Sequence, residues 1–255
     1  MIKQNEKEIR CFNDVKDSFY DMLTKRCSKL KCDYTDTNLD EVYNILSSAF
    51  PNPSGSRFPD FVFSNGFIEH FQVSAANENK KGSKHNIAVN DFERGSNENI
   101  ERLKNEFLQS PPRKNFVTGT YDLKVVTHEM ESPEYAYESF VKSFKRNFEK
   151  HIESLQKYTG DKSIGIFLIE LAGPRLTVLR NNNFRAFYRL AIDRDLLEYI
   201  DKYTAYLKYI FFVSLDDYEV LELNKIPHLL NNIPQGLTFG VGRFRNMNWT
   251  LFIGI

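Results

Sequence analysis

The sequence predicts an α/β protein, in which helices cover the faces of a mixed β-sheet. Two apolar-rich runs, Phe58–Phe63 and Phe67–Val73, flank Ser64-Asn65-Gly66, which is typical of a β-hairpin whose turn uses the positive φ of Asn-Gly. Ser163–Leu171 is an apolar run bounded by turn residues, as in a buried strand. Apolar residues recur at helical spacing in four stretches, which are residues 12–23, 39–49, 137–155 and 196–207. Helices and strands in this order favour a sheet with helices on its faces.

The first half of the chain predicts helices on both sides of the hairpin. Residues 1–50 predict two helices, and Pro51 and Pro53 end the second. Residues 76–99 carry several Lys and Asn and few large apolar side chains, which predicts a long exposed loop. A helix over 97–108 and a strand over 116–127 follow.

The second half predicts a long helix and then several strands. Ser132-Pro133-Glu134 is typical of a helix start, with Ser132 as the N-cap, and this helix runs to Tyr158. The remaining predicted elements are the buried strand, a strand at 176–179, a helix at 194–209, strands at 210–215 and 218–223, and a strand or hairpin from 236 onward.

Composition and charge limit the function classes. The 255 residues carry 34 basic and 34 acidic side chains, so a global basic field for nucleic acid is excluded and binding would need a local patch. Cys11, Cys27 and Cys32 lack a CxxC pattern, which favours reduced structural thiols. The charged start resembles no signal peptide, and the longest apolar run is too short to span a bilayer. We therefore expect a cytoplasmic protein without a membrane partner.

The hairpin carries two carboxylates in apolar surroundings. Asp60 lies on its first strand and Glu69 on its second. A carboxylate among Phe, Val and Ile is costly to bury unless it is paired or binds a cation. Two of them on adjacent strands predict one shared site.

Pro59-Asp60 and Ile68-Glu69, between an earlier helix and a later helix with a buried strand, resemble the PD-(D/E)XK nuclease superfamily. Its members place two acids on neighbouring strands and a Lys two residues after the second acid. The resemblance implies a restriction-endonuclease-like core over about 38–172, followed by an αβ extension over about 174–255. No linker in the sequence divides the chain, so we expect a single domain over 1–255. The resemblance also implies a nuclease of a restriction or defence system that cleaves DNA or RNA and holds Mg²⁺ (or Mn²⁺) through Asp60 and Glu69. Glu41, in the preceding helix, is the candidate third ligand.

The sequence departs from this pattern at Phe71, which stands where the superfamily has Lys. Three interpretations follow. Lys80 or Lys81, or Gln72, takes the water-orienting role; the active face is that of His70 and Gln72; or the site is inactive. Lys80 and Lys81, with Lys84, would also be the local basic loop that contacts DNA or RNA.

Other functions remain open from the residues alone. An inactive nuclease fold would bind nucleic acid or a protein partner, and zero net charge favours a globular protein without a nucleic-acid role. Glu41 follows a plausible N-cap and suits the helix dipole without any catalytic role. The histidines are scattered without zinc spacing, and nucleotide-binding and GxSxG or HExxH motifs are absent from the sequence.

Overall fold

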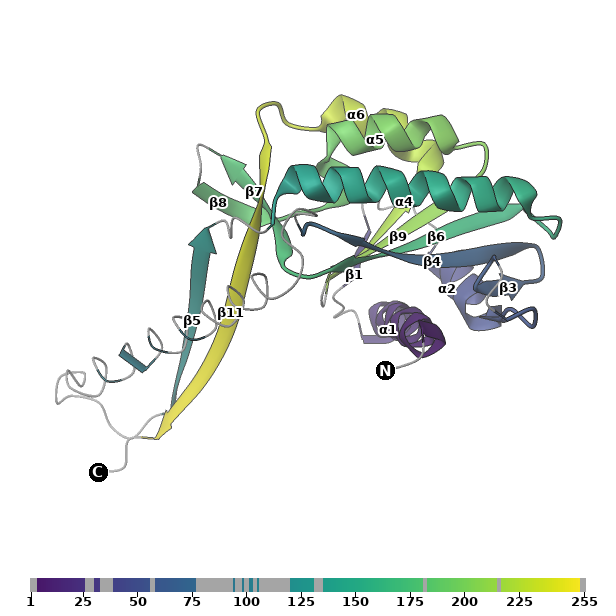
Figure 1. The fold of residues 1–255 in the computed structure, drawn as a ribbon. Helices are drawn as coiled ribbons and strands as arrows, with labels where there is room; N and C mark the ends of the chain where they lie inside the picture. Colours follow the sequence, from purple (N-terminus) through teal and green to yellow (C-terminus); the bar gives the residue numbers. More distant parts are fainter. Residues whose placement is uncertain are drawn as a thin grey trace.

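The computed structural model describes residues 4–25, 30–32, 39–55, 58–76, 94, 98, 101–102, 105, 120–130, 135–180, 183–214 and 217–252. The predicted mixed sheet with helices on its faces is confirmed (Figure 1). Seven strands form the central sheet in the order β1-β10-β9-β6-β4-β3-β2. These strands are β1 (Leu30–Cys32), β2 (Phe50–Pro51), β3 (Phe61–Phe63), β4 (Gly66–Ser74), β6 (Ile164–Ala172), β9 (Tyr209–Ser214) and β10 (Asp217–Glu222).

The middle of this sheet is parallel and one side is a meander. Strands β3 and β4 pair antiparallel as the predicted hairpin, and β2 pairs antiparallel with β3. Strands β4, β6 and β9 pair parallel, and a parallel pair needs a long crossover connection, which α4 (Tyr137–Lys157) supplies before β6. Strand β4 is therefore a central strand and is covered on both faces.

Two helical layers cover the sheet (Figure 1). On one face, α1 (Gln4–Lys25) and α2 (Leu39–Ser48) pack over apolar side chains that include Ile68 of β4. On the other face, α4, α5 (Arg194–Ile200) and α6 (Ile226–Asn232) pack over a cluster that includes Phe67 and Phe71 of β4. Alternate residues of β4 thus belong to different cores, as the period of two in a strand requires.

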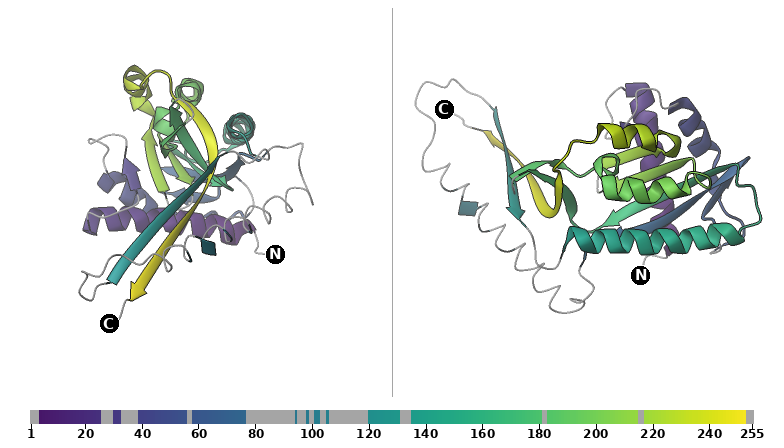
Figure 2. Two further views of the ribbon diagram at one scale, coloured as in Figure 1. Left: turned by 90° about the vertical axis from the view of Figure 1, so that its left-hand side faces the viewer. Right: turned by 90° about the horizontal axis from the view of Figure 1, so that it is seen from above.

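A second sheet of four antiparallel strands lies beside the central one, in the order β5-β11-β7-β8. Its strands are β5 (Thr120–Met130), β7 (Arg175–Arg180), β8 (Asn183–Phe187) and β11 (Thr238–Phe252). Strand β11 pairs with β7 at its start and with β5 over the rest of its length. The β5–β11 pair projects away from the central sheet (Figures 1 and 2).

Several boundaries differ from the predictions. Helix α4 starts at Tyr137 with Ala136 as its N-cap, not at Pro133, because Tyr135 is still extended and forms a bridge with Ala76. Helix α5 ends at Ile200, and the 3₁₀ turn Asp201–Tyr203 continues it. The predicted loop at 76–99 and helix at 97–108 lie mostly outside the described residues.

The hairpin turn is also built differently. Gly66 lies within β4 and has no positive φ, so the predicted Asn-Gly turn chemistry is wrong there. Its lack of a side chain serves close packing instead, because a Cβ would lie 2.0 Å from the carbonyl oxygen of Ile164. Among the described helices, none is long and apolar enough to cross a membrane.

Candidate functional site

The candidate site lies where strands β3 and β4 separate. Their ladder ends at the pair Phe61–Ile68, although β4 continues to Ser74. Beyond that pair, the His70 N–H donates to Oδ2 of Asp60 at 2.8 Å. The Asp60 N–H donates to Oε2 of Glu69 at 3.1 Å. The two predicted carboxylates therefore meet at the opening of the hairpin and close it.

The backbone of Asp60 is fixed by the preceding loop. The Asn52 N–H donates to the Asp60 carbonyl at 2.8 Å, and the Asn52 side-chain amide donates to the Pro59 carbonyl at 2.8 Å. Backbone groups of Asp60 and Pro59 are thus paired although the strand ladder has not yet begun. This anchoring holds the Asp60 carboxyl group at the opening.

The side chain of Glu69 lies on the α4 face, where His151 joins it. Nδ1 of His151 is 2.6 Å from Oε1 of Glu69. The His151 ring is stacked on Phe71, with ring centroids 4.4 Å apart and an interplanar angle of 9°. Sequence reasoning missed His151 as a site residue. The available signal was its position on the apolar stripe of α4, three residues after the buried Phe148.

Burial shifts the pKa values of all three groups. It raises the pKa of Asp60 to about 7, and the neighbouring charge of Glu69 adds to the rise. It raises the pKa of Glu69 to about 8, although hydrogen bonds with Asp60 oppose the rise. Burial, together with the charge of Lys150, lowers the pKa of His151 to about 4. Two carboxyl groups with raised pKa values beside a neutral imidazole can hold a cation or exchange protons.

The opposite face of β4 carries a second polar cluster. Nε2 of His70 lies 3.1 Å from Oε2 of Glu170 on β6, and the Gln72 side chain donates to the same oxygen at 2.8 Å. Cys11 of α1 completes the cluster. The hydrogen bond with His70 is the largest cause that lowers the pKa of Glu170, ahead of the one with Gln72.

Of the predicted site residues that the structure describes, Asp60 and Glu69 come together, whereas Gln72 and Glu41 lie elsewhere. Gln72 lies on the far face of β4 from Glu69, as strand alternation predicts. The Glu41 carboxylate accepts a hydrogen bond from Lys208 and one from Tyr209 at 3.5 Å. It lies over β9 on the α2 side, with the sheet between it and Glu69, so it does not join the pair. Lys80, Lys81 and Lys84 lie outside the described residues.

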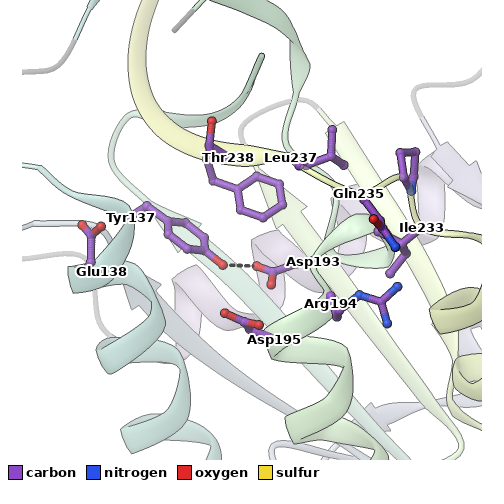
Figure 3. A pocket seen from close by; sticks show the side chains of 12 residues that line it. Tyr137, Glu138, Asp193, Arg194, Asp195, Ile233, Gln235, Leu237 and Thr238 are labelled. Carbon is purple, nitrogen blue, oxygen red and sulfur yellow. Dashed lines mark hydrogen bonds between the residues drawn. The ribbon is translucent and has the colours of Figure 1, made fainter. Parts of the chain in front are cut away.

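A separate hollow of about 650 Å³ lies at the other end of α4 (Figure 3). Tyr137, Asp193, Asp195 and the segment 233–239 line it. His151 is fourteen residues further along α4, or about 21 Å at 1.5 Å per residue. Asp193 accepts hydrogen bonds from Tyr137 at 2.5 Å and Tyr188 at 2.6 Å, so its carboxylate is already satisfied.

Comparisons with known proteins add no assignment, because no family model, curated protein or solved structure matches this chain.

Proposed function

We propose that this protein is a Mg²⁺-dependent nuclease in which Asp60 and Glu69 are the metal-binding carboxylates. The observation that carries the proposal is that two carboxyl groups meet where β3 and β4 separate. The surrounding elements follow the order helix, hairpin, helix and buried strand that the resemblance to PD-(D/E)XK nucleases implies. The proposed substrate is the phosphodiester backbone of DNA, and RNA is the second substrate to assay.

The donor set at Asp60 and Glu69 suits a hard divalent cation. Both residues offer carboxylate oxygens, which Mg²⁺ prefers, and Oδ1 of Asp60 accepts no hydrogen bond from the described residues. Burial is the main cause of both raised pKa values and makes the ionised carboxylates unfavourable there, so a bound cation would offset that cost. When bound, Mg²⁺ would lower the pKa of its water and offset negative charge on the phosphate.

His151 is the candidate for the role of the missing Lys. With Glu69 ionised, Nδ1–H of His151 donates to Oε1 of Glu69, and Nε2 keeps a lone pair. The lowered pKa, about 4, keeps this imidazole neutral near pH 7 but also makes Nε2 a weaker base, so the proposed proton transfer would depend on a water made more acidic by the cation. The His151 side chain is 16% exposed, which leaves water a route to the ring.

Phe71 favours a second candidate function, which is nucleic-acid binding without cleavage. At the position where the superfamily has Lys, this ring is 6% exposed and packs edge-on against Phe148 and Phe167. The Phe71 ring leaves no room for a Lys side chain at that position. This alternative predicts salt-sensitive binding of nucleic acid that survives EDTA, with no cleavage.

A cleavage assay separates these functions. Plasmid DNA and RNA are incubated with the wild type and Glu69→Gln in Mg²⁺, Mn²⁺ or EDTA. We expect metal-dependent cleavage that Glu69→Gln reduces at least about a hundredfold, because a metal ligand is lost. Glu153→Gln, at an exposed position of α4, is the matched control and should cleave like the wild type. Absence of cleavage in the wild type, or full cleavage by Glu69→Gln, would overturn the proposal.

The role of His151 has its own test. His151→Ala should reduce cleavage about a hundredfold or more, as expected for loss of a general base. The double variant Phe71→Lys/His151→Ala places a Lys two residues after Glu69 and vacates the space of the imidazole. It should recover part of the lost cleavage. Equal activity of His151→Ala and the wild type would show that another group takes the proton.

A further inference from the structure

We propose that Cys11, His70 and Glu170 form a zinc site that joins helix α1 to the central sheet. One ligand atom from each of these residues lies within 4.8 Å of the other two. The three residues come from α1, β4 and β6, which are far apart in sequence and adjacent in the fold. The site is separate from the Asp60–Glu69 pair, because it lies on the other face of β4, and it does not rest on the proposed nuclease function.

The ligand types point to zinc and not to magnesium. A thiolate, an imidazole and a carboxylate are the three ligand classes of zinc in proteins, whereas magnesium takes oxygen ligands. With zinc bond lengths of about 2.0–2.3 Å in a tetrahedron, neighbouring ligand atoms are about 3.3–3.7 Å apart. Nε2 of His70 and Oε2 of Glu170 are already 3.1 Å apart. Only a small movement of the Cys11 side chain is needed to close the site.

A second observation at the same place comes from the hydrogen bonding of His70. This residue is 4% exposed, and its Nδ1 atom has no hydrogen-bond partner among the described residues. A buried polar atom without a partner is costly, and such atoms are rare in folded proteins. Glu170 satisfies only one nitrogen of this imidazole. The buried ring thus has more polar capacity than its hydrogen bond to Glu170 uses, and the zinc ligand would be Nε2, the nitrogen that faces Glu170.

The thiol of Cys11 would have to lose its proton to bind a metal ion. Burial, together with the negative charges of Glu170 and Asp14, raises the pKa of the Cys11 thiol, so a bare thiolate is unfavourable there. A metal ion would replace the thiol proton and balance those charges. The Glu170 side chain is 21% exposed, which gives an entry path and leaves the fourth coordination position to water. Gln72 holds Glu170 in place, as an outer-shell partner of a metal ligand does.

Metal binding to the whole chain tests this proposal. Purified protein is stripped with chelator and titrated with Zn²⁺, and bound metal and the unfolding midpoint are measured. We expect one Zn²⁺ per chain and a midpoint raised by about 5 °C or more at a free zinc concentration about a hundredfold above Kd. Cys11→Ala and His70→Gln should each weaken binding at least about a hundredfold.

Controls separate this site from other thiols and from the acidic pair. Cys27→Ala and Cys32→Ala remove the two other cysteines of the chain and should leave zinc affinity unchanged. Glu69→Gln should reduce metal-dependent cleavage at least about a hundredfold and still bind zinc, so the two proposals fail independently. Wild-type protein that binds no zinc, or Cys11→Ala that binds it normally, would overturn the site.

Cobalt substitution keeps the test decisive if the Cys11 and His70 variants do not fold. Co²⁺ added to the wild type should give the near-ultraviolet absorption of a thiolate–cobalt bond, and Zn²⁺ should displace it. Co²⁺ bound without this absorption would exclude Cys11 as a ligand and overturn the proposal.

Discussion

Asp193 and the Asp60–Glu69 pair are two sets of buried carboxyl groups with opposite surroundings. Asp193 is the N-cap of α5, and its carboxylate accepts hydrogen bonds from the Tyr137 hydroxyl (Figure 3), the Tyr188 hydroxyl and the Leu196 N–H. The pair at the hairpin places one acid against another. Burial raises the pKa of the carboxyl groups in both places. A raised pKa alone therefore does not distinguish a structural acid from a functional one.

The neighbouring groups make the distinction. Every donor around Asp193 belongs to the protein, and its carboxylate caps α5. These interactions stabilise the folded state, so Asp193 has a structural role. Glu219 behaves in the same way, because it accepts the N–H groups of Leu190 and Ala191 at 2.7 and 3.0 Å. The hairpin acids also accept backbone N–H groups, from His70 and Asp60, but they differ in that the charge of Glu69 acts on Asp60 and raises its pKa. A binding site for a cation is expected where such repulsion is tolerated.

The largest expected effect is on stability at Asp193. Asp193→Ala removes the cap of α5 and leaves the hydroxyls of Tyr137 and Tyr188 without their acceptor, so we expect a loss of about 3 to 5 kcal/mol in the free energy of unfolding. Urea denaturation at pH 7 measures it. Asp195→Ala, two residues away at an exposed position, should cost less than about 1 kcal/mol. Similar losses in both variants would remove the distinction between the two sets of acids.

The second largest expected effect, a change at Glu69, should increase the free energy of unfolding instead of lowering it. The folded-state pKa values of Asp60 and Glu69, about 7 and about 8, lie above their ordinary values of 3.8 and 4.5. The unfolded chain therefore loses these protons first, and stability falls as pH rises from about 4 to about 8. Glu69→Gln has no such proton to lose. In EDTA it should stabilise the protein by about 2 kcal/mol at pH 8.5 and by little at pH 4.

Denaturation curves across this pH range check that prediction. The wild type should become less stable toward pH 8.5, the variant should show a flatter profile, and Mg²⁺ should restore stability to the wild type alone. A destabilising Glu69→Gln at pH 8.5 would place Glu69 with Asp193 among the structural acids.

Local patterns predicted the part of the site that depends on neighbours in sequence. Alternation along β4 placed Glu69 with Phe71 and His70 with Gln72, and the hairpin placed Asp60 beside Glu69. The turn itself was predicted wrongly, because the glycine is needed for close approach to β6 and not for its φ value.

Contacts that depend on the crossover connection could not be predicted from the sequence. His151 contacts Glu69 because Phe144 and Phe148 pack α4 against the sheet. This packing brings together two residues that are 82 positions apart in the sequence. His70 meets Glu170 only through the parallel register of β4 and β6, 100 positions apart. Residue spacing carries no information about such pairs, so neither histidine had a predicted partner.

The smallest expected effect concerns Glu41, which represents a third kind of acid, one that is paired with a cationic side chain near the surface. Its carboxylate pairs with Lys208, and the two side chains are 33% and 35% exposed, so water screens the pair. Glu41→Gln should cost less than about 1 kcal/mol in urea denaturation and leave metal-dependent cleavage unchanged. Loss of cleavage with normal stability would make Glu41 a ligand after all. An acid with a cationic partner at the surface contributes little to folding or metal binding, whereas an acid facing another acid in the interior is expected either to stay protonated or to bind a cation.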